Sequence, residues 1–117
     1  MNLTKDSNKT IRGYKVFDRD WTCNPGGKPF QYEVGHTYEE DVIPKVCVEG
    51  FYFCERVADC FNYYRFDPEF KVAEVIALGD VDTDGFAFCT NKIKIVREIP
   101  WSELPKIMRS NQVEEAC

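Results

Sequence analysis

The sequence predicts an α+β fold in which a mainly antiparallel sheet packs against one central helix, with a short C-terminal helix after it. Three observations carry this prediction. An apolar aromatic run enters a helix-period stripe within Gly50–Tyr64, β-branched runs recur around it, and the predicted order is three strands, a helix, two strands and a helix. Because 117 residues suit one domain, we expect a flexible lead over residues 1–10, a domain over 11–109 and a polar tail over 110–117.

The first half of the chain predicts three strands. Ile11–Asp18 alternates apolar and polar residues, and Gly13 within it indicates a bulge or a close approach of another segment. Cys23–Pro29 has the Asn-Pro and Gly-Gly composition of a turn, and Phe30–Val34 follows as a short extended piece. Val46–Phe53 is rich in valine and phenylalanine and is typical of a central strand.

The second half predicts two further strands. Lys71–Leu78 is rich in β-branched residues, and Gly79–Gly85 is an acidic turn by composition. Phe86–Ile99 follows as a long strand, and its polar pair Thr90-Asn91 indicates an interruption.

Two helices are predicted. Apolar residues recur over Glu55–Tyr64 at the spacing of one helix face, and the helix ends before Pro68 because proline disfavours helical backbone in the preceding residue. Pro100–Arg109 forms the second helix, with Ser102 as its N-cap and Pro105 in its first turn.

Charge and composition exclude several classes. The formal net charge of −5 argues against a protein that binds nucleic acid by neutralising phosphates. The polar N-terminus lacks the apolar core of a signal peptide, and no apolar run approaches the ~20 residues of a membrane helix. We therefore expect a cytoplasmic protein with no membrane partner.

The six cysteines indicate free thiols rather than disulfides or a metal site. Without a signal peptide the reduced form is favoured, and no pair has CxxC spacing. His36, the only histidine, lies in a turn by composition and carries no clear sign of a Cys–His pair. We expect no metal, no cofactor and cysteines that act as small apolar residues.

The ordered blocks IRGYKVFDRDWTC, FQYEVGHTYEE, CVEGFYFCERVADCFNYY, VAEVIALG and TNKIKIVREIPWSEL resemble an uncharacterised domain family of phages and prophages over residues 11–104. Two departures from the family pattern stand out. The turn within Cys23–Glu33 is longer, and Tyr52 stands where the family usually has histidine. The resemblance implies a phage origin and no established activity.

That origin favours a protein that acts on its host. Small phage proteins often bind and block a host protein, so by analogy we expect a non-enzymatic inhibitor of a host defence protein, acting in the host cytoplasm. Anti-CRISPR activity is its most concrete form. A role in the virion or in prophage maintenance is the alternative that involves no host target.

Acidic and aromatic residues on predicted loops and at a helix end are the candidate partner-binding residues. They are Glu39, Glu40, Asp41, Asp80, Asp82, Asp84, Tyr63 and Tyr64. The acids suit a partner with a basic groove that normally holds nucleic acid, and the tyrosines suit interface anchors. Solvated charge and core aromatics remain the simpler interpretation of the same residues.

An ADP-ribosyltransferase-like, NAD-binding enzyme is the alternative function. Arg12 on the first strand, Tyr52 on an aromatic strand before a helix and Glu98 on a late strand follow the order of such enzymes. Glu98 would orient the ribose or activate an acceptor, and Tyr52 would stack on nicotinamide. Aromatic strands mostly fill cores, which favours a structural role for Tyr52.

The segment Asp80–Gly85 matches the first half of a calcium loop, with acids at positions 1, 3 and 5 and glycine at 6. Position 12 would be Asn91 instead of glutamate, and the flanks are predicted strands. A solvated turn is therefore the favoured interpretation.

Overall fold

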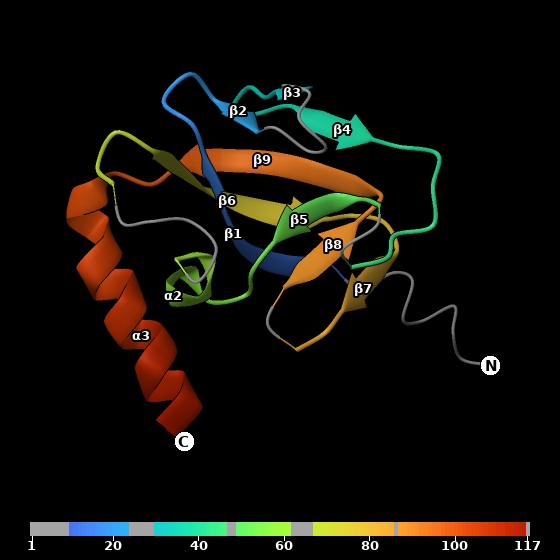
Figure 1. The fold of residues 1–117 in the computed structure, drawn as a ribbon. Helices are drawn as coiled ribbons and strands as arrows, with labels where there is room; N and C mark the ends of the chain where they lie inside the picture. The colour runs from blue at the N-terminus through green and yellow to red at the C-terminus, as the bar shows by residue number, and fades with distance from the viewer. Residues whose placement is uncertain (1–9, 24–29, 47–48, 62–66, 86, 117) are drawn as a thin grey trace.

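The computed structural model describes residues 10–23, 30–46, 49–61, 67–85 and 87–116 of the chain (Figure 1). These residues form two antiparallel sheets and a two-stranded ribbon, with two α-helices beside the main sheet. The predicted α+β class and antiparallel pairing are confirmed. The predicted turn after Cys23 and most of the predicted lead lie outside the described residues.

The main sheet has four strands. In order across the sheet they are β1 (Ile11–Phe17), β6 (Lys71–Ala77), β9 (Lys92–Glu98) and β4 (Thr37–Glu39). β1 pairs with β6 along its full length, whereas the β6–β9 pairing shifts register between Glu74 and Val75. The strands predicted over Ile11–Asp18 and Lys71–Leu78 are confirmed to within one residue.

A smaller sheet lies across one face of the main sheet (Figure 1). Its strands, in order, are β5 (Phe51–Phe53), β8 (Phe88–Thr90) and β7 (Val81–Thr83). β2 (Thr22–Cys23) and β3 (Phe30–Gln31) form the two-stranded ribbon. The chain passes between the two sheets four times, from β4 to β5, from β5 to β6, from β6 to β7 and from β8 to β9.

Two predicted segments of this region differ in the structure. Within the predicted strand Val46–Phe53, the described strand is β5 alone. Lys45 and Glu49 exchange backbone hydrogen bonds of 2.9 Å, and Gly50 has a φ of +121°, so the chain turns before β5 begins. The predicted turn Gly79–Gly85 contains β7, because β8 offers it a pairing edge that the sequence does not reveal.

The interruption predicted near Thr90-Asn91 is confirmed, since β8 ends at Thr90 and β9 begins at Lys92. Thr90 Oγ1 accepts a hydrogen bond of 3.3 Å from the Lys92 amide, which stabilises the corner between the two sheets.

Two hydrophobic clusters hold the layers together. The first lies between the sheets and includes Phe17, Phe51 and Ile95. The second lies on the opposite face of the main sheet and includes Val57 and Leu104. Burying a side chain of this size contributes about 1.5–3 kcal/mol, so these clusters account for the stacking of the layers.

The helices differ from their predictions in length. α2 is a single turn over Val57–Cys60, and residues 62–64 of the predicted helix lie outside the described residues. The described residues do not show a central helix over Glu55–Tyr64. Its N-cap, Arg56, makes no side-chain capping bond, and the Phe61 amide already turns back to Ala58 O at 3.2 Å. One turn is enough to present its buried residues to the second cluster.

The C-terminal helix is longer than predicted. A 3-10 turn, η2 (Trp101–Glu103), leads into α3 (Leu104–Ala116), which places much of the predicted polar tail in a helix. Pro105 lies in the first turn of α3, as predicted. The predicted N-cap at Ser102 is wrong, because Ser102 lies inside η2 and the cap residue there is Pro100.

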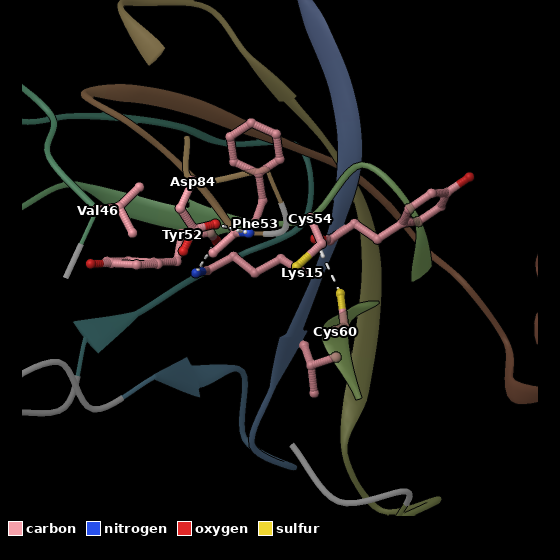
Figure 2. Close-up of a pocket in the computed structure, with 10 residues that line it drawn as sticks. Lys15, Val46, Tyr52, Phe53, Cys54, Cys60 and Asp84 are labelled. Atoms are coloured by element: carbon pink, nitrogen blue, oxygen red, sulfur yellow. Dashed lines mark hydrogen bonds between the residues drawn. The ribbon is translucent and has the colours of Figure 1, made fainter. Parts of the chain in front are cut away.

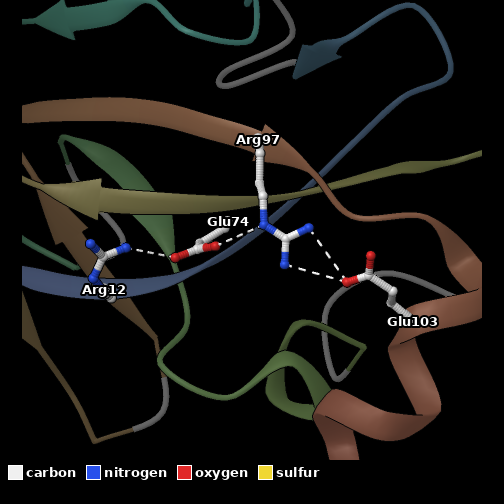
Figure 3. Close-up of polar contacts among 4 residues, drawn as sticks. All are labelled: Arg12, Glu74, Arg97 and Glu103. Atoms are coloured by element: carbon white, nitrogen blue, oxygen red, sulfur yellow. Dashed lines mark hydrogen bonds and ion pairs between the residues drawn. The ribbon is translucent and has the colours of Figure 1, made fainter.

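An ionic chain on the surface joins β1, β6, β9 and η2 (Figure 3). Glu74 accepts from Arg12 at 2.6 Å and from Arg97 at 3.2 Å. Arg97 also pairs with Glu103 at 3.3 Å, so it connects the sheet to the start of the C-terminal helical segment. Exposed pairs of this kind contribute about 0.2–1 kcal/mol each.

Candidate functional site

Asn91, at the corner between the two sheets, brings the two predicted acidic loops together. Its Oδ1 accepts the amide of Asp80 at 2.9 Å, and its Nδ2 donates to Val42 O at 3.1 Å. Its backbone carbonyl accepts the amide of Glu40 at 2.8 Å. The loop after β4 and the loop before β7 therefore lie against the same side chain, although they are about forty positions apart in the sequence.

We call the surface formed by Glu39, Glu40, Asp41 and Asp80 the acidic edge. Within the described part of the chain, the carboxylates of the first three have no hydrogen-bond or ion-pair partner, and Glu39 and Asp41 are exposed. Asp80 Oδ2 lies 3.5 Å from Asn91 Nδ2. These carboxylates are available to a partner without breaking a strong contact of the fold.

Ile43 lies in the same loop and is 82% exposed, the highest exposure among the large hydrophobic residues described. The loop on which it sits is held at both sides. Asn91 donates to Val42 O, and Asp82 Oδ2 accepts the amide of Val46 at 2.9 Å. An apolar side chain on a restrained loop, next to carboxylates, has the composition of an interface anchor with a polar rim.

The other predicted binding residues lie elsewhere. Asp82 holds the loop through Val46, and Asp84 accepts the amide of Ala87 at 2.9 Å. Asp82 and Asp84 therefore also stabilise the local fold, and replacing either one would remove a hydrogen bond as well as a charge. Tyr63 and Tyr64 lie outside the described residues.

A pocket of about 420 Å³ opens between β1 and the smaller sheet (Figure 2). Its wall is mainly apolar and aromatic, with one amine, two thiols and one carboxylate. The lining residues are Tyr14, Lys15, Val16, Val46, Tyr52, Phe53, Cys54, Cys60, Asp84 and Ala87. A volume of this size falls within the range of small-molecule sites, about 300–1,000 Å³.

Lys15 is the buried polar residue of this pocket, with only 6% of its surface exposed. Its Nζ donates to Tyr52 O at 2.6 Å and lies 5.8 Å and 5.6 Å from the ring centres of Phe17 and Tyr32. The aromatic faces and the carbonyl oxygen place negative electrostatic potential near the ammonium group. None of these three partners carries a formal charge.

Cys54 and Cys60 both line the pocket and lie near each other (Figure 2). A hydrogen bond from Cys60 lowers the pKa of the Cys54 thiol, although burial acts in the opposite direction. The same bond, together with burial, raises the pKa of Cys60 well above its usual value. Cys60 Sγ also lies 3.5 Å from Tyr14 O. Cys23, Cys54, Cys60 and Cys89 are free thiols among the described residues.

The structure does not bring the three residues of the enzymatic alternative into this pocket. Tyr52 lines it, whereas Arg12 and Glu98 are not among its lining residues. Arg12 pairs with Glu74 at 2.6 Å, and Glu98 lies 3.8 Å from Lys71.

The calcium-loop match does not form a loop, because β7 runs through it and Asp82 accepts the Val46 amide. Over the residues that the structure describes, no group of three or more His, Cys, Asp or Glu side chains is arranged to hold a metal ion. His36 follows a turn, as predicted, and lies 3.8 Å from Glu33. Its side chain is 56% exposed and away from the pocket.

A family model described as "Domain of unknown function (DUF7666)" matches residues 11–107. The chain belongs to this family. The comparison confirms an uncharacterised domain family over the region expected from the sequence blocks. Neither the curated proteins nor the solved structures gave a match. No helix within the described ranges has the length and apolar character needed to cross a membrane.

Three features of the DUF7666 chain have no counterpart among the sequence predictions. The sequence predicts an interruption at Asn91 and a position 12 of the calcium-loop match there, but no contact between loops, and it gives no role to Ile43 or Lys15. The polar Asn91 between two β-rich runs is a visible signal for a corner. The exposure of Ile43 and the burial of Lys15 depend on tertiary packing, which the alternation within a strand does not report.

Proposed function

We propose that this chain is a phage- or prophage-encoded protein-binding domain that inhibits a host defence protein, with anti-CRISPR activity as its most concrete form. The sequence blocks that resemble a phage family support the origin, and with it action in the host cytoplasm. The acidic edge beside Ile43 is the observation that carries the binding role.

The chemistry of this surface favours a basic partner. Three carboxylates without partners in the described structure lie beside a restrained apolar side chain. A groove lined with lysine and arginine, such as one that normally holds nucleic acid, complements that charge. The pocket supports the NAD-dependent alternative less, because Arg12 and Glu98 do not line it.

The first test is capture of host proteins on the tagged chain at low and at high salt. The variant Glu39→Gln/Glu40→Gln/Asp41→Asn removes three negative charges while keeping side-chain size. We expect one captured protein, weaker capture at high salt because counterions screen the edge, and capture by the variant reduced about tenfold or more.

A matched control is Glu55→Gln/Glu69→Gln/Glu98→Gln, which removes the same charge from exposed positions away from the edge. Of these, Glu69 and Glu98 make only exposed ion pairs, at 3.0 Å and 3.8 Å. The control should bind as the parent chain does. Equal loss in both variants would show that only net charge matters, and unchanged binding by the first would contradict the assignment of the edge.

A further inference from the structure

Lys15 is a buried cation that makes no ion pair with the described residues, although Asp84 lines the same pocket. Among the described residues, its one hydrogen-bond partner is the neutral Tyr52 carbonyl, and no carboxylate lies within 4.0 Å of its Nζ. A buried charge without an opposite charge is costly, which favours a site that recruits one.

The pocket provides room for an anion at this amine. Lys15 lines it, and Figure 2 shows the side chain running from β1 toward Tyr52 with the other lining residues around it. An ammonium group has three donors, and Tyr52 O takes one of them. The remaining two can be shared by the two oxygens of a carboxylate.

The rest of the wall selects for an apolar body. Val16, Val46, Phe53 and Ala87 line the pocket beside the amine. A ligand with a carboxylate head and a hydrocarbon body would match the amine and the wall together, and its transfer from water would be favourable along the apolar part.

We propose that this pocket is a binding site for a small monocarboxylate with an apolar body, whose carboxylate is held by Lys15. Asp84 also lines the pocket and bears the opposite charge to Lys15. Its Oδ1 accepts the Ala87 amide, which fixes its carboxylate on the β7–β8 turn. Repulsion by Asp84 is expected to limit affinity for the anion.

The test uses octanoate, octan-1-ol and octylammonium as probes that share a hydrocarbon chain and differ in the head group. Binding is followed by NMR titration of the backbone amides of the full chain. We expect octanoate to shift signals from β1 and β5 and to bind about tenfold or more tightly than octan-1-ol, with octylammonium weaker still. No octanoate binding, or equal or tighter binding of either other probe, would overturn the proposal.

Variants locate the head group. Lys15→Met keeps an apolar stem and should reduce the affinity for octanoate to that for octan-1-ol. Asp84→Asn should increase the affinity for octanoate severalfold. Lys94→Met, on the exposed part of β9, is the matched control and should leave it unchanged. Undiminished binding by a folded Lys15→Met chain would overturn the assignment. If that variant does not fold, the head-group preference of the parent chain decides alone.

Discussion

At the scale of single residues, the absence of a side chain at one position lets two strands pack closely. This position is Gly13, where β1 packs against the end of β5. A Cβ at Gly13 would lie 2.5 Å from Cys54 O and 2.6 Å from Phe53 Cδ2. Tyr14 and Cys54 exchange backbone hydrogen bonds of 2.7 and 2.9 Å beside it. The close approach predicted for this glycine is confirmed, and it connects the two sheets.

We expect Gly13→Ala to reduce the free energy of unfolding by about 1–3 kcal/mol, because the backbone of Cys54 cannot move without breaking its bonds to Tyr14. Urea unfolding followed by circular dichroism measures this change. An alanine variant as stable as the parent would contradict the close approach of β1 and β5.

At the scale of elements, the strands were predicted better than the helices. Alternation and β-branched runs locate β1, β6 and β9 well because these strands are long and form most of the main sheet. The helix stripe over Glu55–Tyr64 overestimated α2, since only one turn is needed to cover the second cluster. Helix propensity does not indicate how many turns of an apolar helix face the main sheet can bury.

The start of the C-terminal helix offers a direct contrast between sequence and structure. If Ser102 capped the helix, Ser102→Ala would reduce the free energy of unfolding by about 1 kcal/mol. In the structure Ser102 is exposed inside η2 and has no hydrogen bond from its hydroxyl in the described set. We expect the substitution to change the free energy of unfolding by less than about 0.5 kcal/mol. A loss near the capping value in thermal or urea unfolding would favour the sequence-based start.

In the candidate sites too, the sequence predicts single residues, whereas their contacts depend on tertiary packing. The acids Glu39, Glu40 and Asp41 were recognised from composition, because charge clusters on loops are visible in sequence. Their juxtaposition with Asp80 was not, since it depends on the Asn91 side chain. Lys15 lies on the same face of β1 as Phe17, whereas Val16 lies on the other face. The smaller sheet covers the face of Lys15 and Phe17 and buries it.

At the scale of the whole molecule, the two proposed roles belong to two different regions of the structure. The acidic edge lies where the loops after β4 and before β7 meet at Asn91, and the Lys15 pocket lies between β1 and the smaller sheet. Val46 belongs to both regions, because its amide is held by Asp82 and its side chain lines the pocket. The structure thus joins a candidate interface to a candidate ligand site through one loop.

The most direct test of the binding role is the affinity of the captured partner for Ile43→Ser, measured by titration calorimetry beside Val34→Ser. Both side chains are exposed, at 82% and 42%, so neither change should disturb the core. We predict that Ile43→Ser weakens binding about tenfold or more and that Val34→Ser leaves it unchanged, because only Ile43 lies beside the acidic edge. Equal affinities for the parent and Ile43→Ser, or no partner captured at either salt concentration, would contradict the proposed interface.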